Sequence, residues 1–134
     1  MSFTLTDQDK HTLRLAAWGA VSLMSAAGAA GSAHKVATHG SIALTSATGM
    51  VGHVVTKAPK GVKYGKTVDA LADQVLPALT SAMSLLKKQS PAVAANFRST
   101  VIVAIDAASR TQPGAPSPTL VEMARKITAA LDAA

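Results

Sequence analysis

Lysines at regular three-residue intervals are the clearest chemical signal in this sequence. They lie in the stretch TKAPKGVKYGKTVD and are Lys57, Lys60, Lys63 and Lys66. No acidic residue interrupts them before Asp69, and residues 34–66 carry five lysines and no acid, so most of the net charge of +6 lies in about a quarter of the chain. A local basic patch attracts phosphate, nucleic acid or another anionic surface.

The end of this stretch is similar to the end of a phosphate-binding P-loop, because Gly65, Lys66 and Thr67 precede a predicted helix. A P-loop needs another glycine five residues before the second one, and Lys60 stands at that position. The start of a helix still attracts anions through its free N–H groups, although Asp69 competes for them. The candidate anion-binding residues are Lys57, Lys60, Lys63, Lys66 and Thr67. The alternative is a solvated loop that only connects two helices.

Histidines are the other residues that could carry chemistry. Asp7 and His11 lie one helical turn apart, but no third metal ligand is near them in the sequence. His39 and His53 are 14 residues apart, close to one face of a predicted helix. We expect them to be buried imidazoles that bond to hydroxyl groups rather than to a metal. The chain also has no cysteine, so we predict no catalytic residues, no metal site and no cofactor.

Helix signals divide the chain into five segments that must position these residues. Thr6 and Asp9 form a potential capping box, and the potential caps Ser90 and Ser117 are each followed by a proline at the first helical position. The predicted helices span residues 7–30, 33–57, 67–89, 91–111 and 118–132. Because alanine is the strongest helix former, the composition favours an all-α protein, and 134 residues are enough for a single domain, residues 1–134.

The first two predicted helices are unusually rich in alanine, glycine and serine. They are similar to each other at an offset of 21 residues, with seven identical positions, which leaves an internal duplication open. Glycine inside a helix costs about 1 kcal/mol relative to alanine, and close approach of two backbones is the usual compensation. We therefore predict a compact five-helix bundle. Its first two helices, separated at Gly31 and Ser32, form a tight antiparallel hairpin that three amphipathic helices cover, with Trp18 as a packing anchor.

Two uncharged stretches, residues 15–33 and 36–56, are long enough to cross a bilayer. They consist mainly of small and hydroxylated residues, and the chain has a single tryptophan and no aromatic belt, so a membrane span is not expected. The N-terminus lacks a basic start followed by an apolar stretch, which favours a cytoplasmic protein.

These patterns predict binding rather than catalysis. The first hypothesis is a non-enzymatic small helical scaffold or protein-interaction domain that self-associates as a homo-oligomer. The alternative is binding of an anion or a nucleic acid through the basic loop, residues 57–66. A further alternative is a carrier that holds a small apolar ligand between its helices.

Overall fold

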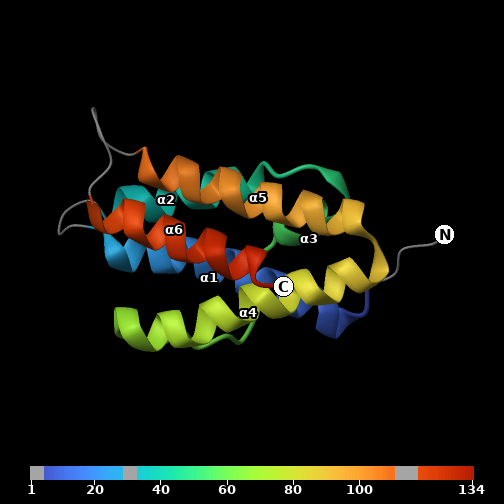
Figure 1. The fold of residues 1–134 in the computed structure, drawn as a ribbon. Helices are drawn as coiled ribbons and strands as arrows, with labels where there is room; N and C mark the ends of the chain where they lie inside the picture. The colour runs from blue at the N-terminus through green and yellow to red at the C-terminus, as the bar shows by residue number, and fades with distance from the viewer. Residues whose placement is uncertain (1–4, 29–32, 111–117) are drawn as a thin grey trace.

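The computed structural model describes residues 5–28, 33–110 and 118–134, which form six packed helices and no strand (Figure 1). The helices are α1 (Asp7–Ala27), α2 (Ala33–Thr45), α3 (Gly49–Val55), α4 (Val68–Gln89), α5 (Pro91–Ser109) and α6 (Pro118–Asp132). The predicted all-α class is confirmed. The predicted stop at Gly31 and Ser32 and the predicted cap at Ser117 lie outside the described residues.

Local signals place the starts of α1, α4 and α5 correctly. At α1 the Asp9 N–H donates to the Thr6 hydroxyl and the Thr6 N–H donates to the Asp9 carboxylate, both at 3.0 Å, which is the predicted capping box. At α4 the Thr67 hydroxyl accepts from the Ala70 N–H at 3.1 Å. Ser90 precedes α5 but makes no side-chain cap bond, so proline at the first helical position is the signal that holds there. The α1 helix ends at Ala27, three residues before the predicted end.

The predicted helix over 33–57 is wrong, because the chain breaks between α2 and α3. Gly49 has φ +89°, a conformation that no other residue adopts easily, and α3 starts from it. The side chain of Asn96 on α5 replaces the missing helical bonds. Its Oδ1 accepts from the N–H groups of Val51 and Gly52 at 3.0 and 3.2 Å, and its Nδ2 donates to the Thr48 carbonyl at 3.2 Å. The break that separates α2 from α3 is therefore stabilised by a side chain that lies at least 44 residues away in the sequence.

The centre of the bundle is the pair α1 and α5, since each of them contacts all five other helices. Within the described residues α2 contacts α1, α3 and α5 and neither α4 nor α6. It runs back along α1, as the predicted hairpin requires, but it lies at the periphery (Figure 1). The expectation that the first two helices form the centre is therefore wrong, because α5 takes the place of α2 with a broad buried face: Val93, Ala94, Phe97, Thr100, Val101, Ala104, Ile105 and Ala108.

The helical glycines do allow close approach, but not all between the same helices. A Cβ on Gly40 of α2 would lie 2.7 Å from a Val21 methyl on α1, so this pair approaches as predicted. A Cβ on Gly19 of α1 would instead lie 2.7 Å from a Val75 methyl on α4. Gly19 and Gly40 correspond at the offset of 21 residues, yet they face different neighbours.

The amphipathic patterns of the last three helices are largely confirmed. On α4 the buried residues are Leu71, Val75, Leu79, Ala82, Met83 and Leu86. On α6 they are Leu120, Met123, Ile127 and Leu131. Val68, at the first helical position of α4, is 37% exposed. The α4 helix continues through Pro77. Within the described residues, no helix has the length and apolar character needed to cross a membrane.

Candidate anion-binding loop

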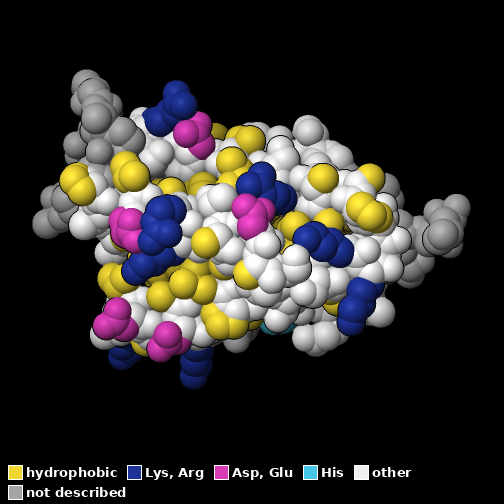
Figure 2. Space-filling view, in the orientation of Figure 1, with side chains coloured by type: hydrophobic (Ala, Val, Ile, Leu, Met, Phe, Trp, Pro, Cys, Tyr) yellow, Lys and Arg dark blue, Asp and Glu magenta, His cyan; other side chains and the backbone are white. Residues whose placement is uncertain are grey.

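The basic loop connects the end of α3 to the start of α4. Its four lysine side chains, those of Lys57, Lys60, Lys63 and Lys66, are all exposed, as is Thr67. The ion pairs among the described residues are Arg98–Asp132, Arg110–Asp106 and Arg125–Glu122, and none of them involves a loop lysine. Figure 2 shows basic side chains projecting from the edge of the molecule beneath α4, where Figure 1 places the chain that leads into that helix. The charge of the loop is therefore directed to solvent.

The backbone of the basic loop is held in place on its α4 side. Gln74 donates from Nε2 to the Lys63 carbonyl and accepts at Oε1 from the Gly65 N–H, both at 3.0 Å. A Cβ on Gly65 would lie 2.7 Å from the Ala70 Cβ, so only glycine lets the loop approach α4 this closely. Gly61 has φ +70° and forms the turn in the middle. The sequence analysis did not identify Gln74. No local pattern indicates that this side chain bonds to the backbone of Gly65, nine residues earlier in the chain.

The other end of the loop is anchored to α1 through the last turn of α3. Arg14 Nε donates to the Val54 carbonyl and Trp18 Nε1 donates to the Val55 carbonyl, both at 2.9 Å. These bonds satisfy carbonyls that a helix end leaves free. The first of these bonds also holds the Arg14 guanidinium at Val54, which precedes Lys57 by three residues. Trp18 packs on the core as predicted, whereas the role of Arg14 depends on a contact across 40 residues and has no local signal.

Thr67 and its neighbours on α4 limit the site on one side. The Thr67 hydroxyl oxygen caps α4, which is a structural role. Asp69 and Asp73 are exposed on the first two turns of α4, and acidic side chains lie beside the basic ones in Figure 2. These two carboxylates place negative charge at the α4 end of the loop, whereas the Arg14 guanidinium bonds to Val54 near the Lys57 end.

Tyr64 turns inward from the loop. Its hydroxyl donates to the Leu15 carbonyl on α1 at 3.1 Å, and its ring packs against the core. Burial raises the pKa of Tyr64 to about 12. Tyr64, the one aromatic residue of the loop, therefore attaches the loop to α1 and to the core.

The pH dependence of stability should report this burial. The unfolded chain releases the Tyr64 proton near pH 10, whereas the folded chain keeps it to about pH 12, so the stability contributed by Tyr64 is complete below pH 10 and is lost as the pH rises to 12. Since the chain has a single tyrosine, phenolate absorbance gives its midpoint directly. Tyr64→Phe is the control, and it should flatten the stability profile in this range. A midpoint near 10 in the folded protein would contradict the burial.

The histidine prediction is wrong. His39 and His53 are exposed, on α2 and α3 respectively. The break between these helices and their peripheral position turn both side chains away from the core. In the part of the chain that the structure describes, no three His, Cys, Asp or Glu residues gather in a group able to hold a metal ion.

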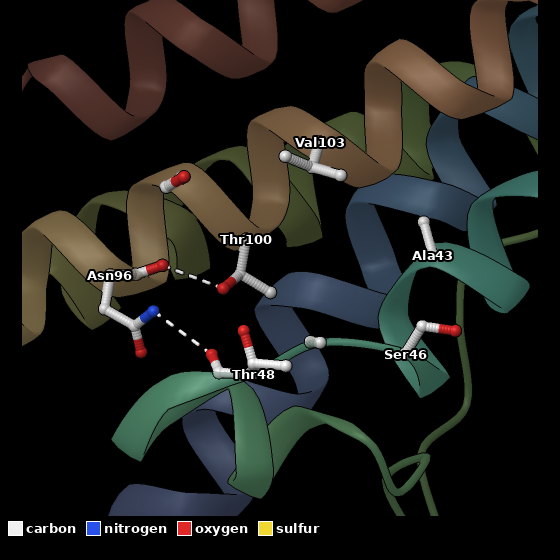
Figure 3. Close-up of a pocket in the computed structure, with 8 residues that line it drawn as sticks. Ala43, Ser46, Thr48, Asn96, Thr100 and Val103 are labelled. Atoms are coloured by element: carbon white, nitrogen blue, oxygen red, sulfur yellow. Dashed lines mark hydrogen bonds between the residues drawn. The ribbon is translucent and has the colours of Figure 1, made fainter.

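A groove at the junction of α2 and α3 is the second candidate site (Figure 3). It has a volume of about 260 Å³ and is lined by Ala43, Ser46, Ala47, Thr48, Asn96, Ser99, Thr100 and Val103. Thr100 donates from its hydroxyl to the Asn96 carbonyl at 2.8 Å, and the Asn96 amide is occupied by α3. The lining has hydroxyl and methyl groups but no charge, so it offers hydrogen bonds without an acid, a base or an activated nucleophile.

A second hollow is the candidate site for the small apolar ligand of the predicted carrier. It lies where α1, α4 and α6 meet, has a volume of about 450 Å³ and is lined mainly by apolar side chains: Ala26, Ala27, Val68, Pro118 and Met123 with Thr119, Glu122 and Lys126. It is open to solvent, so a ligand there would remain partly hydrated.

Comparison with protein-family models finds no match for this chain, and comparisons with curated proteins and with solved structures find none either. The geometry itself therefore defines the class, which is an all-α helical bundle with an exposed, anchored basic loop.

Proposed function

We propose that this chain is a non-enzymatic helical interaction domain whose basic loop binds a polyanion. The observation that carries the proposal is the combination of four exposed lysines, none in an ion pair of the described residues, with a backbone held by Gln74 and Tyr64. A loop that is already ordered loses less conformational entropy on binding than a free one. More of the free energy gained by its lysines on contact with the partner therefore contributes to affinity, because little of it is needed to order the loop.

The strength of such binding depends on salt. Exposed charges are screened within about 10 Å at 0.1 M salt, so lysines act on a partner only at short range. Each lysine that neutralises a phosphate also releases counterions, which makes binding strongest at low ionic strength. The anchored guanidinium of Arg14 adds to the field at the Lys57 end, while Asp69 reduces it at the other.

Replacing all four loop lysines with glutamine tests the proposal. We expect the wild type to bind a labelled nucleic acid in low salt, and the variant to bind at least about tenfold more weakly, because most phosphate contacts are lost. The measurement is fluorescence anisotropy, with circular dichroism and thermal melting to show that the fold is kept.

A matched control separates the loop from the total charge. Glutamine at Lys87, Lys88, Arg110 and Lys126, all exposed and at the ends of α4 and α5 or on α6, removes the same charge from other parts of the surface. This control should bind nearly as the wild type does. Equal weakening in both variants would show that the net charge acts without a site, and no binding by the wild type in low salt would refute the proposal.

Self-association remains a separate prediction. Ile42 on α2 and Val103 on α5 are 59% and 56% exposed, and they are aliphatic side chains that a second copy could cover. Sedimentation velocity of the same samples gives the assembly state, so the scaffold hypothesis and polyanion binding are tested on one set of proteins.

A further inference from the structure

The aromatic side chains near the basic loop are engaged within the protein. Tyr64 bonds to Leu15, and its ring lies 3.4 Å from where a Cβ on Gly19 would be. Trp18 bonds to the Val55 carbonyl and packs on the core. Phe97 is fully buried, and Phe3 lies outside the described residues. Proteins that bind single strands stack bases on exposed rings, and the described tyrosine, tryptophan and phenylalanine rings do not offer that platform.

The loop also lacks side chains suited to reading base edges. Two hydrogen bonds to one base are made mainly by arginine, lysine, asparagine or glutamine side chains held in a defined position. The one amide at the loop, that of Gln74, already bonds through both its oxygen and its nitrogen. Arg14 uses its Nε for the Val54 carbonyl. What remains, besides the Nη groups of Arg14, is a set of exposed lysines on flexible side chains, which act on phosphates as point charges.

We propose that the polyanion is a double-stranded nucleic acid, held through its phosphates without regard to sequence. This inference rests on the proposed function and narrows it. A duplex carries one negative charge per about 1.7 Å of its axis, more than a single strand does. Lysines three residues apart are separated by at most about 10 Å of chain, so each can meet a different phosphate.

The loop is poorly suited to an anionic membrane, the main competing surface. Binding in the membrane interface uses large apolar side chains that insert beside the basic ones. Between the lysines, the loop exposes only Ala58 and Gly61, while Pro59 and Val62 are partly buried. Lysines alone would hold a lipid surface only by charge.

Titrations with nucleic acids of defined form test this inference. Two duplexes of unrelated sequence, about 20 base pairs each, are compared with their separated strands over a range of salt concentrations. We expect equal affinity for the two duplexes and about tenfold weaker binding of the strands. The logarithm of the binding constant should fall with the logarithm of salt at a slope of about −0.9 for each neutralised phosphate, so about −3.6 for four lysines.

The outcomes separate this inference from the proposed function. Equal or tighter binding of the single strands, or different affinities for the two duplexes, overturns the duplex inference but leaves polyanion binding in place. Binding to phosphatidylserine vesicles that exceeds binding to either duplex overturns it as well. A slope steeper than about −5 would mean that contacts extend beyond the loop, which would overturn the assignment to these lysines. Absence of all binding refutes the proposed function itself.

Discussion

Replacing Asn96 with alanine is expected to destabilise the protein by about 3 kcal/mol and to release α3 from α5. The change removes an acceptor for the Val51 and Gly52 N–H groups and a donor for the Thr48 carbonyl. Each such hydrogen bond contributes about 1 kcal/mol, and a partner left unpaired in a partly buried site adds to the loss. At seven residues, α3 is too short to persist as an isolated helix.

Urea denaturation measures the global effect of Asn96→Ala, and hydrogen exchange at Val51 and Gly52 measures the local one. Asn96→Asp is the informative companion, because a carboxylate keeps the acceptor and suits the positive end of a helix, so it should retain most of the stability. Ser99→Ala on the exposed side of α5 is the control and should change stability by less than about 0.5 kcal/mol. If Asn96→Ala and Ser99→Ala behave alike, Asn96 does not cap α3.

Replacing Gly19 with valine is expected to cost about 3 kcal/mol. The added Cβ would lie 2.7 Å from one Val75 methyl and 3.2 Å from the other, before the valine methyls are placed. Neither branched side chain can swing aside, so α1 and α4 must separate, and overpacking of this kind typically costs 1–3 kcal/mol or occasionally more. Because Gly19 also adjoins the Tyr64 ring, the shift should disturb the anchor of the basic loop.

A double substitution tests the mechanism. Val75→Ala removes the opposing methyls, so Gly19→Val combined with Val75→Ala should be more stable than the sum of the two single effects by about 1–2 kcal/mol. Gly61→Ala is the control for conformation alone, since no atom lies within 4 Å of its Cβ and only its φ of +70° is strained. It should cost about 1 kcal/mol. Strictly additive effects at Gly19 and Val75 would rule out the steric explanation.

Much of the fold could be predicted where local chemistry decides it. The capping box at Thr6, the cap at Thr67 and the proline at position 91 place helix starts correctly, because each works through groups within a few residues. The stripes of α4, α5 and α6 are visible as apolar residues at helical spacing. The exposure of the four loop lysines also follows from their own charge, since an unpaired ammonium group costs too much to bury.

Other features depend on contacts between distant residues, and the chain carries no local mark of them. A tract of small residues without charge can bury either face, so its pattern did not reveal that α2 lies at the periphery or that His39 and His53 face solvent. Nor did it show the break before Gly49, which requires the Asn96 side chain from α5.

Some features of the basic loop likewise follow from its own sequence, whereas others depend on the folded molecule. Its charge, its glycines and its position before a helix can be read along the chain, because they belong to neighbouring residues. Its shape was decided only by the folded molecule, where Gln74, Tyr64 and the Arg14–Val54 contact bring three helices to it. Periodicity determines which residues prefer to be buried, while the choice of neighbour for each face depends on packing the whole chain at once.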